Sequence, residues 1–129
     1  PTQSLQVEVD GNVIDANKTI VRRYYEEVIG NPAVADELFA ADHVHYPGLT
    51  PGPDGVKQLI RMAKSKFGND MSYILDHLIA VVDLVAADFT LSGQGAYTRE
   101  MCMFRVVDGK IVARSCVYCD PPPGSRLCY

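Results

Sequence analysis

The feature that most limits the fold is a long β-hairpin near the end of the chain, in the run MCMFRVVDGKIVARSCVYCD from Met101 to Asp120. Two segments rich in apolar, β-branched residues meet there at Asp108-Gly109. An Asp-Gly pair suits a tight hairpin turn, because the turn needs positive φ angles and glycine adopts them without a Cβ penalty. The sequence therefore predicts two antiparallel strands, near residues 97–107 and 110–119.

Helical patterns fill the first half of the chain. Apolar residues recur at helical spacing from Ala16 to Ile29, and Asp15 is the expected N-cap of this helix. Asn31-Pro32 is typical of the start of a short second helix, which we expect to end near Ala41. A third helix is predicted from an apolar face made by Val56, Leu59, Ile60, Ala63 and Phe67.

Strand patterns fill the second half of the chain. Besides the hairpin, we expect a short strand in DHVHYPG, which begins at Asp42, and longer strands near residues 71–81 and 84–92. Helices followed by antiparallel strands predict an α+β domain with helices on one face of a bent sheet. We expect one domain over residues 1–129, with an N-terminal arm at 1–14 and a C-terminal tail at 120–129.

Composition limits the classes of function. A chain of 129 residues with 47% hydrophobic residues can bury a core that needs neither disulfides nor metal. The net charge of −4, without a basic cluster, argues against nucleic-acid binding. No apolar run reaches the roughly 18–20 residues of a membrane span, and the N-terminus lacks a secretion pattern. We therefore expect a cytoplasmic protein with no nucleic-acid or membrane partner, whose four cysteines are reduced thiols.

Five stretches of the chain, in this order, carry a family resemblance: NKTIVRRYYEEVI, ELFAADHVHYPG, GPDGVKQLIRMAKSKF, DFTLSG and MFRVVDGKIV. With them the chain resembles the SnoaL-like polyketide cyclases, which share the nuclear transport factor-like fold with ketosteroid isomerases and limonene epoxide hydrolases. The resemblance implies three N-terminal helices packed on a strongly curved, mostly antiparallel sheet. It also implies that helices and sheet form a cone with an apolar pocket for a small molecule, and a reaction without cofactor or metal.

The same resemblance assigns roles to particular residues. In such enzymes a carboxylate moves a proton next to a carbonyl while neighbouring donors hold the enolate. Tyr24 falls about where the isomerases keep their oxyanion tyrosine, and the isomerase base maps near His45 or Tyr46. The cyclase histidine and acid are replaced by Cys102 and Cys116. The residues of the epoxide hydrolase reaction are also absent, so that reaction is not expected.

Asp88 is a further candidate for proton transfer. It lies between Ala87 and Phe89 in a predicted strand, where a carboxylate is either buried with a raised pKa or turned to solvent. The predicted catalytic residues are thus His45, Asp88 and Tyr24. The predicted pocket residues are Tyr46, Cys102, Phe104, Cys116 and Tyr118.

Cys102 and Cys116 have two interpretations. If a bulge in the hairpin turns both to one face, they could act as a nucleophile, a base or a redox couple. Otherwise they are two small buried apolar residues. His43 and His45 share a strand face and could share a metal ion or a substrate. The histidines and cysteines of the chain taken together predict no metal site.

Two functions from different classes follow. The first is a cofactor-free cyclase or isomerase that acts on a small apolar carbonyl compound. The second is a ligand-binding or assembly module that kept the cone and lost the chemistry. A homodimer formed through the outer sheet face is expected in either case, since members of this fold often pair that way.

Overall fold

The structure is a computed structural model that describes residues 11–44 and 49–119. The helical part comprises α1 (Gly11–Arg23), the π-helical turn η1 (Tyr24–Val28), the 3-10 turn η2 (Pro32–Val34), α2 (Ala35–Leu38) and α3 (Pro53–Phe67). The strands are β1 (Phe39–Val44), β2 (Ser72–Val81), β3 (Leu84–Gly93), β4 (Ala96–Val107) and β5 (Lys110–Cys119). Within the described ranges, no helix is long and apolar enough to cross a membrane.

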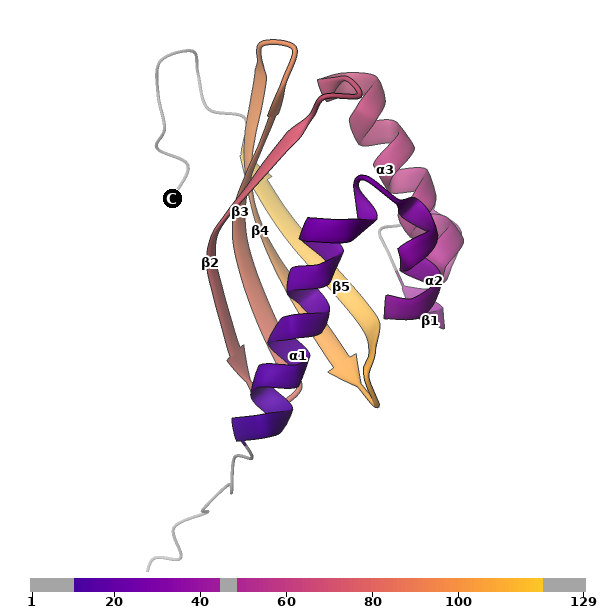
Figure 1. The fold of residues 1–129 in the computed structure, drawn as a ribbon, viewed down its shortest axis with the longest axis vertical. Helices are drawn as coiled ribbons and strands as arrows, with labels where there is room; N and C mark the ends of the chain where they lie inside the picture. Colours follow the sequence, from indigo (N-terminus) through magenta and orange to yellow (C-terminus); the bar gives the residue numbers. More distant parts are fainter. Residues whose placement is uncertain (1–10, 45–48, 120–129) are drawn as a thin grey trace, which may run out of the picture.

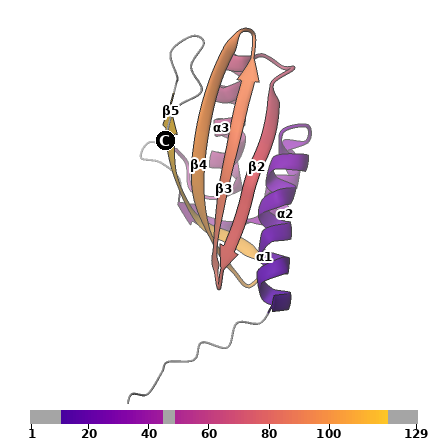
Figure 2. The same cartoon turned by 90° about the vertical axis from the view of Figure 1, so that its left-hand side faces the viewer.

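The five strands form one curved sheet in the order β1-β5-β4-β3-β2. All neighbours are antiparallel except β1, which pairs in parallel with β5. The helices lie on one side of this sheet, and β2, β3 and β4 are uncovered on the other (Figures 1 and 2). The predicted α+β fold, with three helices on a mostly antiparallel sheet, is therefore confirmed.

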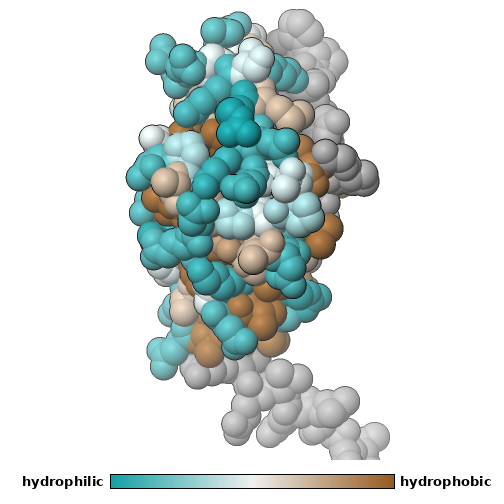
Figure 3. All heavy atoms as spheres, turned by 90° about the vertical axis from the view of Figure 1, so that its right-hand side faces the viewer, coloured by the Kyte–Doolittle hydropathy of each residue, from teal (hydrophilic) through white to brown (hydrophobic). Residues whose placement is uncertain are grey.

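Alternation along the strands separates two faces. The buried apolar side chains of β3 and β4 face the helices, and the side chains between them, buried Asp88 included, face outward. The helix-facing side holds a core rich in rings, in which Tyr25 packs against Phe89 with ring centroids 4.6 Å apart. The side of the molecule on which α2 and α3 lie presents a largely hydrophilic surface (Figure 3).

The first helix starts earlier than predicted. It begins at Gly11, so Asp15 lies inside the helix rather than at its N-cap, and residues 11–14 do not belong to an arm. The reason is that the apolar face of the helix extends to Val13, ahead of the predicted start. Val13 and Ile20 lie in one groove with the β2–β3 turn. Asn17 fixes this contact, since its side-chain amide donates a hydrogen bond of 3.1 Å to the carbonyl of Val82. The first ten residues and the predicted tail at 120–129 lie outside the described residues.

The second helix ends sooner than predicted, at Leu38 rather than near Ala41. Phe39 has extended backbone angles, and its side chain is almost fully buried. Its position in the sheet is set by parallel pairing with Ile111 of β5. Tertiary pairing thus overrides the local helical pattern, and the residues from Phe39 to Val44 become β1.

A close approach between α3 and the end of β3 gives the first test. A Cβ placed on Gly93 would overlap the carbonyl oxygen of Phe67, which is backbone and cannot turn away. We expect Gly93→Ala to lower the free energy of unfolding by about 2 kcal/mol, the usual size of an overpacking effect, measured by urea denaturation. Gly30→Ala is the matched control, because no atom lies within 4 Å of the added methyl. Equal stability of the two variants would contradict this packing.

Candidate functional site

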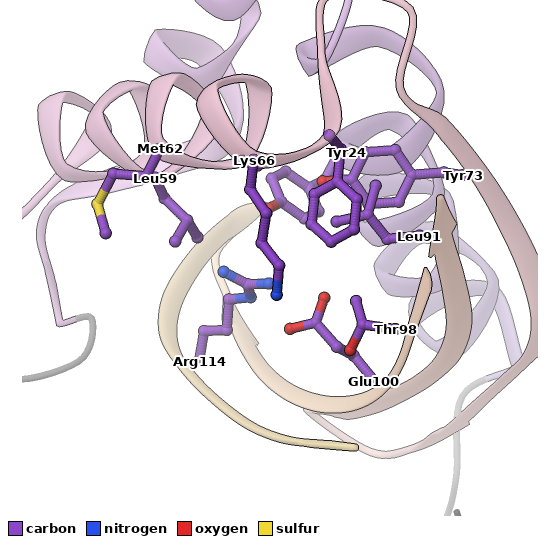
Figure 4. Close-up of a pocket in the computed structure, with 11 residues that line it drawn as sticks. Tyr24, Leu59, Met62, Lys66, Tyr73, Leu91, Thr98, Glu100 and Arg114 are labelled. Carbon is purple, nitrogen blue, oxygen red and sulfur yellow. The ribbon is translucent and has the colours of Figure 1, made fainter. Parts of the chain in front are cut away.

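A cavity of about 290 Å³ opens between α3 and the inner face of the sheet (Figure 4). Its walls are mostly apolar, and a few polar and charged groups reach into it from β4, β5 and α3. The residues that line it are Tyr24, Leu59, Met62, Ala63, Lys66, Phe67, Tyr73, Leu91, Thr98, Glu100 and Arg114. Apolar walls with a few polar groups are typical of small-molecule sites.

A bulge in the β4–β5 hairpin decides which side chains face this cavity. The register shifts between Arg105 and Val106, so that Val106 pairs with Ile111 but Arg105 pairs with Ala113. The extra residue moves the rest of β5 by one position and therefore to the opposite face. Arg114 consequently lies on the cavity side, directly across from Phe104.

Three charged side chains meet in the cavity. Figure 4 shows Lys66 reaching from α3 toward Arg114 of β5 and Glu100 of β4. The Arg114 guanidinium also lies over the ring of Tyr24, with 5.3 Å from its carbon to the ring centroid, and over Phe104 at 5.6 Å. Among the described residues, the cavity thus holds one carboxylate and two cations against an aromatic wall.

Tyr24 enters this wall because the first helix widens. In the π-helical turn η1, the consecutive residues Tyr24 and Tyr25 are both buried, with ring centroids 4.8 Å apart. Such insertions in helices are frequent at functional sites. Burial raises the pKa of the Tyr24 hydroxyl, the charge of Arg114 lowers it by less, and Glu100 raises it further. At neutral pH the hydroxyl therefore keeps its proton and can donate a hydrogen bond.

Asp88 does not reach the cavity. Its neighbours Ala87 and Phe89 face inward, so strand alternation turns Asp88 to the outer face of the sheet. There its carboxylate accepts hydrogen bonds of 3.0 Å from Arg99 and lies 2.9 Å from Nδ1 of His77. Of the two alternatives that the sequence left open, Asp88 is buried rather than turned to solvent, and it belongs to an ion-pair cluster on the side away from the cavity.

Cys102 and Cys116 are directly opposite each other on β4 and β5 and form a disulfide. The bulge that one of the two interpretations required is present, because without it Cys102 would pair with Ser115 and Cys116 would face outward. The expectation that both cysteines are reduced thiols is wrong for this pair. Spacing along the sequence could not reveal the pairing, since it depends on that one inserted residue.

The other predicted residues fall in three places. Phe104 is fully buried beneath Tyr24, in the core rather than in the cavity wall. His45 and Tyr46 lie outside the described residues, and for Tyr118 the structure describes only the backbone, opposite Glu100. Among residues 11–44 and 49–119, no group of three His, Cys, Asp or Glu side chains is placed to hold a metal ion.

Sequence reasoning missed the charged residues of the cavity. Glu100 and Arg114 each stand two positions before one of the cysteines, so each shares a strand face with that cysteine. The signal that could have found them is this alternation, since a charged residue on a face that also carries Cys102 and Phe104 is exceptional. That Arg114 and Cys116 lie on the same face as Cys102 depends on the bulge, which the sequence alone does not place.

Comparison with known proteins gives one family and many similar structures. The model of the SnoaL-like domain matches residues 21–114. A search of curated proteins finds no match. IdmH from Streptomyces antibioticus, described as a candidate polyketide cyclase, is 21% identical with a TM-score of 0.65, over 79% of this chain and 91% of that one.

Two further solved structures show the same fold. A candidate SnoaL-like polyketide cyclase from Jannaschia sp. CCS1 has a TM-score of 0.71 at 13% identity, covering 87% of this chain and 91% of its own. An LEH-like epoxide hydrolase from M. tuberculosis has a TM-score of 0.63 at 16% identity, covering 81% and 84%. At these identities the likeness concerns the fold, and different reactions share it.

The raised tyrosine pKa values predict a loss of stability in alkali. Burial raises the pKa of Tyr24, Tyr25 and Tyr73 above 10.0, their ordinary value. The stability that these buried, protonated tyrosines contribute is complete below pH 10. It falls as the pH rises further, because their hydroxyls then ionise readily only in the unfolded chain. We expect the free energy of unfolding to decline above pH 10, and Tyr24→Phe to make that decline shallower. Tyrosinate absorbance of the folded wild type near pH 10 that equals the absorbance of all seven tyrosines in the unfolded chain would contradict this.

Proposed function

The chain belongs to the SnoaL-like family, and from that membership we propose that it is an enzyme of the cyclase or isomerase type that acts on a small carbonyl compound. The observation that carries the proposal is the position of Glu100, the one carboxylate among the described residues that line the cavity. It lies beside Arg114 and near the buried hydroxyl of Tyr24, within mostly apolar walls. An acid-base group and neutral or cationic donors at one site are the parts that enolate chemistry needs.

In this proposal Glu100 is the proton carrier. Its carboxylate takes a proton from the carbon next to the substrate carbonyl, and the electron pair moves onto the carbonyl oxygen. Arg114 and the Tyr24 hydroxyl hold the resulting enolate oxygen, with Tyr24 protonated because its pKa is raised. The enolate then either regains the proton at another carbon, which is isomerisation, or attacks a second carbonyl of the same molecule, which closes a ring. In the second case the alkoxide formed at that carbonyl takes the proton back from Glu100.

The proposal moves the proton transfer away from Asp88. That carboxylate is on the outer face and paired with Arg99, so it cannot contact a ligand in the cavity. His45 stays in the proposal as a second proton carrier, because it follows β1 directly and the family resemblance places the isomerase base near it. A His45→Ala variant separates its contribution from that of Glu100.

A ligand-binding protein without turnover is the second candidate. The observation that favours it is the disulfide, since Cys102 and Cys116 stand where the cyclases carry a histidine and an acid. A disulfide offers no proton to transfer. In that case the cavity holds its ligand by apolar contact and by the charges of Lys66, Glu100 and Arg114.

Proton exchange into simple ketones tests the first candidate against the second. We expect the protein to accelerate deuterium uptake at the carbon next to the carbonyl of acetophenone or cyclohexanone, followed by NMR in D2O. Glu100→Gln should slow this exchange by at least about 100-fold, the usual contribution of a general acid-base group. Glu26→Gln is the matched control, because Glu26 is an exposed carboxylate outside this cavity.

Two results would overturn the assignment of proton transfer to Glu100. One is saturable binding of these ketones without any exchange, which is the behaviour of a binding protein. The other is exchange that Glu100→Gln leaves intact while His45→Ala abolishes it, which would transfer the role to His45.

We also propose that two copies of the chain pair through the outer face of the sheet. This face carries large apolar side chains that are more than a third exposed: Ile79, Val81, Met101, Met103 and Val117. They lie on neighbouring strands, since Met101 pairs with Val117 and Met103 with Ala86, the partner of Ile79. An apolar surface of this kind is typical of an interface.

Sedimentation at several protein concentrations tests the dimer. We expect Met103→Glu to weaken dimerisation by at least about 10-fold, equivalent to about 1.4 kcal/mol. Met62→Glu is the matched control for oligomeric state, because Met62 is similarly exposed but lies on α3, on the other side of the sheet. A wild-type protein that sediments as a monomer at every concentration would contradict the proposal.

A further inference from the structure

The disulfide between Cys102 and Cys116 joins two sulfurs in different surroundings. Cys102 is fully buried, whereas Cys116 is only partly buried against the core. Their Cα atoms are 4.0 Å apart, and the pairs Met101–Val117 and Met103–Ser115 hold the strands together on either side. The strand ladder therefore keeps both sulfurs adjacent whether or not the bond between them exists.

A cation lies against the buried sulfur. Nη2 of Arg114 is 3.5 Å from Sγ of Cys102. The guanidinium cannot lose its proton at any physiological pH, and a neighbouring positive charge favours a thiolate over a thiol. A Cys102 sulfur released from the disulfide would therefore be stabilised as an anion where it stands. A thiol with a lowered pKa is also the better leaving group in disulfide exchange.

We propose that Cys102–Cys116 is a thiol–disulfide exchange site for small thiols, with Cys116 as the attacked sulfur and Cys102 as the leaving group. The thiolate of a small thiol bonds to Sγ of Cys116, the disulfide breaks, and the electron pair goes to Sγ of Cys102 beside Arg114. In the mixed disulfide, a second small thiol then attacks the sulfur of the first small thiol. Cys116 is released as a thiol, the two small thiols leave as their disulfide, and the protein is reduced by two electrons.

The reverse reaction uses the same groups. Cys116 attacks the disulfide of the small thiol and becomes a mixed disulfide, and one small thiol leaves. The Cys102 thiolate, held beside it by the strand ladder, then displaces the second small thiol and restores the bond. The inference does not rest on the proposed carbonyl chemistry, because neither reaction needs a ligand in the cavity.

Exchange with glutathione and its disulfide is the test. We use a variant with Cys119→Ser and Cys128→Ser, so that only this pair can react, and follow its state by alkylation and mass spectrometry. We expect reversible reduction and reoxidation with the circular dichroism of the folded protein preserved. With Cys102→Ser added, oxidised glutathione should form a lasting mixed disulfide on Cys116. With Cys116→Ser added instead, the buried Cys102 should react at least about 10-fold more slowly, because access limits exchange.

Variants of Arg114 test the role of its charge separately. Arg114→Gln should slow reduction of the disulfide by about 10-fold, since the leaving thiolate loses its adjacent charge. Arg114→Lys should restore part of that rate, and it serves as the second variant if Arg114→Gln does not fold. Arg105→Gln is the matched control, because that arginine lies on β4 but pairs with Asp83 on the other face.

Two outcomes would overturn the inference. One is a disulfide that glutathione reduces only in urea concentrations that unfold the protein, which is the behaviour of a purely structural bond. The other is a mixed disulfide found on Cys102 rather than on Cys116. Failure of the ketone exchange described above leaves this inference untouched, since the rates are measured without a ketone.

Discussion

The arrangement of the cavity depends on one inserted residue in the β4–β5 hairpin. A strand with strict alternation from the Asp108-Gly109 turn would place Ser115 opposite Cys102 and turn Arg114 outward. The bulge moves the rest of β5 by one position, so that Arg114 and Cys116 face the helices. The positive charge beside Glu100, the cation over the Tyr24 ring and the disulfide all follow from that shift. Bulges next to active sites commonly re-aim side chains in this way.

The second constraint is the burial of charge among rings. Arg114 is partly buried, and its flat guanidinium lies over Tyr24 and Phe104, where an ammonium group would stack less well. The same surroundings keep the Tyr24 hydroxyl protonated, because burial outweighs the neighbouring cation. The site therefore combines the Tyr24 hydroxyl, which stays protonated, with the Arg114 guanidinium, which stays charged. Both are suited to an oxygen that becomes negative during a reaction.

The sequence predicts the sheet well and the site only in part. The four long strands are placed to within one residue, because alternation and the Asp108-Gly109 turn are local signals. The start of α1 and the change from helix to strand at Phe39 depend on contacts with β2 and β5, and a local pattern does not contain them. Asp88 illustrates the same limit, since the local pattern left its burial open, and its face depends on which neighbours turn inward.

The proposed function requires that ligands bind between α3 and the inner sheet face, and methyl NMR can locate the binding site. The protein is labelled at its Ile, Leu and Met methyl groups and titrated with acetophenone, whose ring shifts nearby resonances. We expect shifts at Leu59, Met62 and Leu91, which line the cavity, and none at Ile79 or Met103 on the outer face. Shifts confined to the outer-face methyl groups, or none at millimolar ketone, would contradict it.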